Sequence, residues 1–326
     1  MKKTIYFVTA VVLLVAVALY SAATGSIKVG PWELIQGLIY GGNDHVDVIR
    51  DFRLPRIIVS IMTGAALAVS GVLLQAVMRN PLADAGVIGI SSGAGFVSVL
   101  IATLSPTLIF WMPAFSVIGG LVACFLVYLF SWRSGLQPLR LILVGVAINA
   151  MFSGLSQLFN YRGSYAVGNV NQAVSSMFSM KTWNDVEMIL LYSSIGLIIA
   201  VLLSTWCNML SLQDRTASNL GLRVMRARVI ISFVAVLLAS IATAIGGLIA
   251  FVGLLIPHIA RQMVGTDHKI LIPFCAILGG LLILLADTIG RTIIAPMEIP
   301  ASVIMTIIGG PFLIFMLMRG DRVNGN

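Results

Sequence analysis

The sequence predicts an all-α, polytopic membrane protein with about ten transmembrane helices. Hydrophobic residues make up 59% of the 326 residues and charged residues only 10%, whereas a soluble globular domain carries roughly a quarter charged residues. The charges also avoid the long apolar runs, and runs of about 18 or more apolar residues are typical of transmembrane helices. Because the polar residues are too few to cover a soluble core, we interpret residues 1–326 as a single transmembrane domain.

Ten apolar segments follow one another along the chain. A run of serine and glycine at 91–95 interrupts the third, and hydropathy alone does not decide whether 229–264 is one segment or two. Eight or nine spans are therefore the alternatives to ten. The segments lie at about 4–24, 55–78, 91–108, 111–131, 139–159, 187–207, 229–250, 251–264, 270–294 and 301–318.

The first segment has features of both a signal peptide and a transmembrane helix. Lys2 and Lys3 resemble the charged start of a signal peptide, and Ser21 to Ala23 resembles a cleavage site. The apolar run between them is long for a signal peptide, and many more spans follow it. We therefore expect this segment to be retained as the first span.

The distribution of Lys and Arg orients the spans, since short cytoplasmic loops carry an excess of these residues. With the amino end inside and the spans alternating, the inner loops and tails hold thirteen cations and four acids, and the outer ones hold seven cations and eight acids. The resulting charges of +9 inside and −1 outside add up to the formal +8 of the chain. Topology thus explains the basic character, nucleic-acid binding is not indicated, and both termini are expected in the cytoplasm.

Several kinds of chemistry are not indicated by the sequence. It contains no G-x-x-x-x-G-K-[ST] motif for nucleotide phosphates and no nucleophile with a suitable base, so we expect no enzymatic activity. His and Glu never occur at metal-site spacing, and Cys124, Cys207 and Cys275 lie singly in separate segments. We therefore expect neither a metal site nor a cofactor.

Small residues recur inside the spans. Gly64, Ala68 and Gly71 follow a helical repeat, and glycine pairs occur in later segments. Helices in lipid associate through close approach of their backbones, which small residues permit. The pattern predicts a compact helical bundle and says nothing about its function.

The stretch from Gly247 to Arg261 is apolar enough to lie in lipid, yet Pro257 and His258 stand near its end. Proline cannot donate a backbone hydrogen bond and clashes with the preceding turn. Such a break is tolerated at membrane depth only where protein or water satisfies the freed groups. We expect a helix to end at Pro257-His258 near a membrane surface, at a pathway or a docking surface.

Three arginines are expected on the outer side, where the charge rule makes them unusual. Arg53 and Arg56 lie three residues apart on one face of a starting helix, and Arg291 lies near the outer end of the ninth segment. Such arginines either extend to lipid headgroups or pair with carboxylates of a docking partner. Asp287 is expected to pair with Arg291 one turn later, and is therefore not expected to be a lone proton carrier.

The inner loop 211–228 is predicted to form a short helix that starts at Asp214 and ends before Gly221, followed by a basic stretch. A helix with exposed apolar side chains between two spans fits a lever that moves with a cytoplasmic partner. The alternative is a plain, positively charged connector. The residues assigned to this lever are Leu212, Asp214, Ala217, Leu220 and Gly221.

The fifth segment carries a polar stripe. Asn149, Ser153 and Gln157 follow Gly145 at a strict four-residue repeat, and Asn160 is next on the same face. In lipid, such a stripe must face protein or water. It forms either hydrogen bonds between helices or the wall of a translocation path, and the residues alone leave both open.

These residues and motifs resemble one family over the whole chain: the permease subunits of type II ABC importers for iron–siderophore complexes, haem and cobalamin (FecCD-like permeases). The resemblance is specific because it includes loops as well as spans. The matching stretches include RLPR (53–56), GAALA (64–68), RNPLAD (79–84), SSGA (91–94), SNLGLRVMRAR (218–228) and nearly all of 247–315.

The resemblance implies a multi-pass protein of the bacterial cell membrane with several partners. These are a second permease subunit, two cytoplasmic ATPase subunits and an external substrate-binding protein. It implies that Arg53, Arg56 and Arg291 receive glutamates of the binding protein, that the loop 212–228 couples to the ATPase, and that the fifth segment lines the path. The inner gate is assigned to Gln137, Pro138 and Leu139.

The function expected from this resemblance is the import of a ferric siderophore by alternating access, driven by the ATPase subunits. Haem and cobalamin are the alternative substrates. A less favoured class is a secondary transporter driven by an ion gradient, with Asp287 as the carrier. The sequence does not decide whether the second permease subunit is another copy of this chain.

Overall fold

The computed structural model describes residues 2–24, 49–131, 138–163, 178–295 and 297–323, and each predicted segment lies on a helix. Short elements complete the chain: η1 (Ile49–Arg53), η2 (Pro106–Trp111), α10 (Ser204–Leu210) and α11 (Asp214–Asn219). The longer helices are α1 (Lys2–Ala23), α4 (Leu54–Met78), α5 (Ile90–Leu104), α6 (Met112–Ser131), α7 (Pro138–Gly163), α9 (Trp183–Leu202), α12 (Val224–Gly246), α13 (Val252–Val264), α14 (His268–Thr292) and α15 (Ala301–Val323).

Seven helices in the described part of the chain are long and apolar enough to cross a membrane. They are α1, α6, α9, α12, α14, most of α7, and η1 together with α4. α5 and the first part of α15 are apolar but shorter, and α13 has only 13 residues. The all-helical, polytopic fold is confirmed, whereas the crossing of the membrane by α5, α13 and α15 stays a prediction.

α4 lies at the centre of the bundle, where α12, α13 and α14 contact it. Its approach to α14 requires glycine, because a Cβ at Gly64 would lie 2.1 Å from the carbonyl oxygen of Gly279. A Cβ at Gly71 would likewise lie 2.2 Å from the carbonyl oxygen of Gly253 in α13. The predicted stripe of small residues is therefore the seam along which these helices meet.

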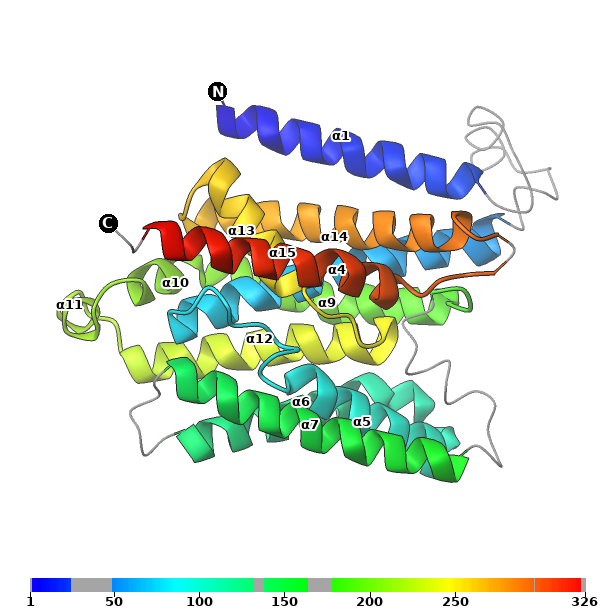
Figure 1. Ribbon diagram of the computed structural model, residues 1–326, viewed down its shortest axis with the longest axis horizontal. Coiled ribbons are helices and arrows are strands. Elements are labelled where there is room, and N and C mark those ends of the chain that lie inside the picture. Colours follow the sequence, from blue (N-terminus) through cyan, green and yellow to red (C-terminus); the bar gives the residue numbers. More distant parts are fainter. Residues whose placement is uncertain (1, 25–48, 132–137, 164–177, 296, 324–326) are drawn as a thin grey trace.

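α1 lies at the edge of the bundle and runs beside α14 (Figure 1). The rings of Phe7 and Phe274 join the two helices, with their centroids 4.9 Å apart. Most other side chains of α1 are not buried by the rest of the chain, as expected of a peripheral helix in lipid. α1 is long and apolar enough to cross a membrane, and its retention as the first span stays a prediction.

The chain breaks between α12 and α13, upstream of the predicted place. Gly247 and Phe251 both have positive φ angles, of 83° and 70°, and the residues between them are not helical. Glycine adopts such an angle readily, whereas a phenylalanine there is unusual. The apolar run 229–264 is therefore two helices, joined by irregular backbone inside the bundle.

Pro257 lies within α13 and does not end it, so the prediction of a helix end at Pro257-His258 was wrong. A proline at this position leaves the carbonyl of Gly253, one turn earlier, without its helical donor. The side-chain amide of Gln75 in α4 donates to that carbonyl at 2.9 Å. A side chain from the central helix thus replaces the missing backbone bond.

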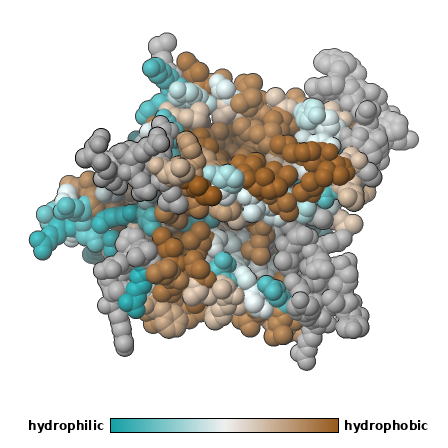
Figure 2. Space-filling model, in the orientation of Figure 1, coloured by the Kyte–Doolittle hydropathy of each residue, from teal (hydrophilic) through white to brown (hydrophobic). Residues whose placement is uncertain are grey.

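The two ends of the bundle differ in polarity. In Figure 1 the marked amino and carboxyl ends lie at the end of the bundle that carries α11. Figure 2 shows hydrophilic residues gathered at that end, while much of the surface over the intervening helices is hydrophobic. Both termini are therefore on one side, as predicted, and the cytoplasmic identity of that side stays a prediction.

Candidate functional site

The ends of α4 and α14 farthest from α11, which we call the outer end after the predicted orientation, are joined by an ion-pair cluster around a buried arginine. Arg56, near the start of α4, is only 8% exposed, and its Nε and Nη2 donate to the two carboxylate oxygens of Asp287 at 2.7 and 2.8 Å. Its Nη1 donates to both carboxylate oxygens of Glu298 at 3.0 and 3.1 Å. One guanidinium thus binds two carboxylates, in the bidentate geometry for which arginine is suited.

Asp287 pairs with Arg56, which corrects the prediction that it pairs with Arg291. Among the described residues, the ion-pair partner of Asp287 within 4 Å is Arg56. The one-turn spacing places Asp287 and Arg291 on the same face of α14, but a buried arginine from another helix takes both oxygens of the carboxylate. Asp287 is therefore an ion-paired acid, as expected, with a different partner.

The other two outer arginines hold the end of α1. Arg53 donates through Nη1 to the carbonyl of Ala22 at 2.7 Å. Arg291 donates through Nη2 to the carbonyl of Ser21 and to its hydroxyl, the latter at 2.9 Å. The three arginines predicted for docking therefore lie where α1, α4 and α14 end. Arg53 and Arg291 keep part of their surface exposed, whereas Arg56 is buried.

At the opposite end of the bundle, Asp214 joins three elements. It is the first residue of α11, and its Oδ1 accepts hydrogen bonds from Nη2 of Arg79 at 2.6 Å and from Nη2 of Arg228 at 3.0 Å. Arg79 directly follows α4, and it also donates to the carbonyls of Leu210, at 2.6 Å, and Leu212. Arg228 lies near the start of α12. A single carboxylate oxygen therefore links α11 to two long helices.

The short helix predicted in the inner loop is present as α11, and Gly221 follows it with a φ angle of +87°. Leu212 and Leu220 are exposed, as expected. Ala217 was also expected to be exposed but is fully buried, which corrects that prediction. The reason is the tight turn after the helix, in which the amide of Leu222 donates to the carbonyl of Ala217 at 3.1 Å and folds the chain back.

The polar stripe of α7 borders a cavity of about 340 Å³, which also touches the break between α12 and α13. Asp84, in the connection between α4 and α5, is 4% exposed, and burial raises the pKa of its carboxyl to about 6. Backbone amides just after Asp84 donate hydrogen bonds that oppose this shift. The polar side chains on the wall of the cavity are Asp84, Ser91, Ser92, Asn149 and Ser153.

The remaining predicted site residues are not gathered at this cavity. Gln157 is exposed and lies outside its wall. Asn160 and the gate residues Gln137, Pro138 and Leu139 lie outside the residues whose side chains the structure describes. Their roles in the path and the gate stay predictions.

Sequence reasoning missed three partners that organise these sites. Glu298 is the second carboxylate on Arg56, Gln75 supports the helix that contains Pro257, and Arg228 holds Asp214. Only the family motifs give a signal for the first two, since both residues lie within matching stretches or beside them. Arg228 ends the matching stretch 218–228 and was counted among the cations of the inner loop, but no partner was assigned to it.

Comparison with known proteins gives these sites their context. The FecCD transport family matches residues 13–319, which is nearly the whole chain. The chain belongs to the FecCD transport family. Permeases of this family are the transmembrane, non-enzymatic subunits of type II ABC importers, so the predicted family and class are confirmed.

Individual relatives match from end to end. The protein of Staphylococcus aureus (strain MSSA476) named as the heme-iron transport system permease protein IsdF is 40% identical over 321 residues, covering 98% of each chain. Its counterpart in strain Newman is 39% identical with the same coverage. Both comparisons include the loops that carry the charged clusters at the two ends of the bundle.

Solved structures confirm the fold. A structure titled as an inward-facing conformation of a metal-chelate type ABC transporter superimposes with a TM-score of 0.79 at 29% identity, covering 98% of this chain and 99% of that chain. PsaBC from Streptococcus pneumoniae, solved with a Fab, shares the fold with a TM-score of 0.60 at 14% identity, covering 87% and 94%. The type II permease fold predicted from the sequence is therefore confirmed.

Proposed function

We propose that this permease imports haem iron across the bacterial cell membrane as part of a binding-protein-dependent ABC importer. The observation that carries the substrate is the full-length identity of 40% to a permease named for heme-iron transport. The sequence alone put a ferric siderophore first and haem second, and the named relatives favour haem. The chain would work with a second permease subunit, two cytoplasmic ATPase subunits and an external binding protein.

The proposed coupling site is α11. Leu212 and Leu220, which flank this helix and are exposed, provide an apolar contact for an ATPase subunit. Asp214 ties the helix to Arg79 after α4 and to Arg228 in α12, so a displacement of α11 reaches both helices. In this mechanism, ATP binding moves the ATPase subunits together, and the two permease subunits tilt to alternate access between the two sides.

The proposed path runs along α7. Asn149 and Ser153 border a polar cavity together with the buried acid Asp84, which supports a path wall over simple hydrogen bonding between two packed helices. The break between α12 and α13 lies on the same cavity, as expected where irregular backbone is tolerated at membrane depth. Gln157 and Asn160 would extend this wall, and Gln137, Pro138 and Leu139 would form the inner gate.

The substrate is tested by reconstituting the complex of permease, ATPase and binding protein into liposomes. We expect uptake of haem that requires ATP and is inhibited by vanadate. Uptake of ferric siderophores with none of haem would restore the siderophore hypothesis. Uptake that follows an ion gradient and ignores vanadate would instead support a secondary transporter, which the ion-paired state of Asp287 disfavours.

The proposed docking surface lies around Arg53, Arg56 and Arg291. Arg53 and Arg291 keep part of their surface exposed and would meet carboxylates of the binding protein, whereas the buried Arg56, already bound to Asp287 and Glu298, would hold the end of α4 in place. Arg53 gives the cleanest test because it is partly exposed and lies before α4. We expect Arg53→Glu to lower the affinity for the binding protein by roughly tenfold or more, since reversing a charge across an interface costs several kcal/mol. The matched control is Arg50→Glu, an exposed arginine one turn away that should keep its affinity. Equal loss in both variants would reject the specific docking role.

Sidedness is tested separately at the tip of the coupling loop. Ser218 is exposed on α11, whereas the neighbouring Ala217 is buried, so Ser218 is the labelling position. In intact cells, a Ser218→Cys variant should resist a membrane-impermeant maleimide and react with it after the membrane is opened. Labelling in intact cells would place α11 outside and contradict the proposed coupling.

A further inference from the structure

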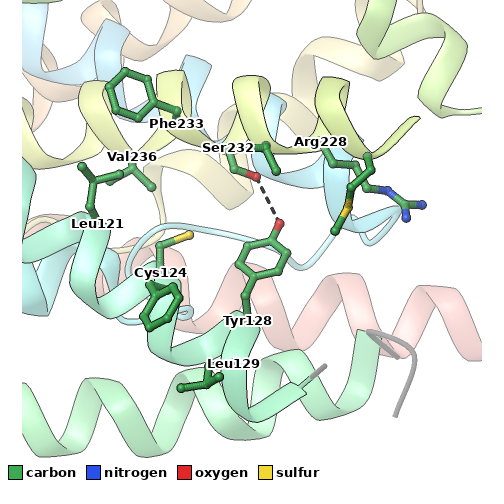
Figure 3. A pocket seen from close by; sticks show the side chains of 11 residues that line it. Leu121, Cys124, Tyr128, Leu129, Arg228, Ser232, Phe233 and Val236 are labelled. Atoms are coloured by element: carbon green, nitrogen blue, oxygen red, sulfur yellow. Dashed lines mark hydrogen bonds between the residues drawn. The ribbon is translucent and has the colours of Figure 1, made fainter. Parts of the chain in front are cut away.

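A groove of about 370 Å³ lies between α6 and α12, away from the α7 cavity and the charged cluster of the outer end. Most side chains on its floor are apolar, and the two hydroxyls there, of Tyr128 and Ser232, hydrogen-bond to each other across the groove at 3.1 Å. Its rim consists of large apolar side chains that are exposed, among them Phe125, Val229 and Phe233. Figure 3 shows the two helices contributing opposite walls, with Arg228 at one end.

The length of the groove matches one leaflet of a bilayer. On α12 it extends from Met225 to Val236, which corresponds to about 16 Å at 1.5 Å per residue. The hydrocarbon core of a bilayer is about 30 Å thick, so the groove covers about half of it. It begins at the end of α12 that leads to α11, and that end is polar. A single extended acyl chain of one leaflet has this shape and depth.

Arg228 supplies a positive charge at the polar end of the groove. Its guanidinium has five N–H donors, of which Nη2 bonds to Asp214 at 3.0 Å. Its Nε has no hydrogen-bond acceptor within the described part of the chain. Because Asp214 also pairs with Arg79, the cluster of two arginines and one acid keeps a net positive charge. An anion beside the partly exposed guanidinium would balance that charge.

We propose that the groove between α6 and α12 binds an anionic phospholipid of the cytoplasmic leaflet, with an acyl chain in the groove and the phosphate on Arg228. This inference rests on the proposed sidedness, which places α11 in the cytoplasm. The lipid phosphate would then sit beside the ion pair that holds the coupling helix. A soluble partner fits this groove less well, because its walls are membrane-spanning helices with exposed apolar rims.

The headgroup contact is tested with purified, delipidated full-length protein by native mass spectrometry, using phosphatidylglycerol and phosphatidylcholine with the same acyl chains. We expect the wild type to retain one phosphatidylglycerol with at least fivefold preference over phosphatidylcholine. Arg228→Gln should reduce this preference to less than twofold, and Arg228→Lys should retain at least half of it. The matched control Arg226→Gln removes a charge from an exposed residue near the same end and should behave as wild type.

The acyl-chain contact is tested by filling the groove. Val229→Trp places a large ring on the rim, and it should reduce the retention of both lipids at least fivefold. The matched control is Ile198→Trp on α9. Ile198 lies outside the groove, and its exposed fraction of 62% is close to the 59% of Val229. All variants are compared at equal elution volume in size-exclusion chromatography, so that loss of folding is not taken for loss of lipid.

Three results with the lipid-binding variants would overturn the proposal. They are an unchanged headgroup preference in Arg228→Gln, an equal loss in Arg226→Gln, and wild-type lipid retention in Val229→Trp. A disulfide between two copies of a Phe233→Cys variant in membranes would also overturn it, because it would show a second chain covering the groove. None of these readouts requires transport, so they remain valid even if the proposed substrate is wrong. Labelling of Ser218→Cys from outside intact cells would instead reject the assignment of the lipid to the cytoplasmic leaflet.

Discussion

The two charged ends of this permease use arginine in opposite ways. At the outer end, Arg56 is 8% exposed and holds Asp287 and Glu298 through four hydrogen bonds. At the other end, Asp214 has a half-exposed side chain and is shared by Arg79 and Arg228 through one oxygen. The outer cluster has two acids on one arginine, and the α11 cluster has two arginines on one acid.

This difference separates a fixed joint from a movable one. Breaking a buried ion pair leaves a charge without water or partner, and the cost is large. Exposed ion pairs contribute little to stability, because water replaces either partner readily. The outer cluster therefore fixes α4 against α14, while the α11 cluster can rearrange with little change in the free energy of unfolding. We expect the conformational change of transport to alter the second cluster more than the first.

The largest effect should come from Asp287→Asn. It removes the buried partner of Arg56 and leaves only the exposed Glu298, so the loss of unfolding free energy should approach the value of about 3–5 kcal/mol that is typical of breaking a buried pair. The measurement is thermal and denaturant unfolding of the purified protein in detergent. Asp51→Asn, which changes an exposed acid at the same end, is the control and should unfold like the wild type. A stable Asp287→Asn variant would show that the outer cluster is not a fixed joint.

A smaller effect is expected from Arg291→Gln, which extends the comparison to α1. The variant loses the charged donor to the carbonyl and hydroxyl of Ser21, and such bonds contribute about 1.5–3 kcal/mol. The loss should be local, so amide hydrogen exchange should accelerate in the last turn of α1 and remain unchanged in α12. Uniform acceleration over both helices would contradict a local role in holding α1.

The smallest effect on stability should come from Asp214→Asn, since exposed ion pairs contribute about 0–1 kcal/mol. Transport should nevertheless fall by about fivefold or more, the lower end of typical coupling between two sites. The paired measurements are denaturant unfolding and ATP-driven uptake in liposomes, with Arg226→Gln as the charge control. If Asp214→Asn lost stability and kept its transport, the two ends would have exchanged the roles assigned to them.

The helices were largely predictable because hydropathy and small-residue spacing are local properties of the sequence. All ten predicted segments lie on helices, and the Gly64 and Gly71 stripe packs against neighbouring helices. The short helix α11 was also predicted, because Asp214 and Gly221 are local start and stop signals. The turn that buries Ala217 was missed, since it depends on how the chain folds back after that glycine.

The partners of charged and irregular residues were not predictable, because they come from distant parts of the chain. Pro257 stays helical since Gln75, on another helix, occupies the carbonyl that the proline leaves free. Asp287 forms its ion pair with Arg56 of α4 and not with Arg291 of its own helix. In both cases the local rule gave the wrong answer, because a buried side chain from α4 forms the hydrogen bonds to the carbonyl of Gly253 or to the carboxylate of Asp287. The site residues on the gate and the end of the polar stripe remain untested for a different reason, since their side chains are not described.

The single oxygen shared at Asp214 has a mechanical consequence. A displacement of α11 acts on two attachment points, Arg79 at the end of α4 and Arg228 near the start of α12, and both of these helices are largely buried. In the proposed coupling, the displacement of α11 is shared by α4 and α12, and the two helices would move at the same time. In the proposed mechanism, one movement of an ATPase subunit would therefore displace α4 and α12 together, without an intermediate element between them.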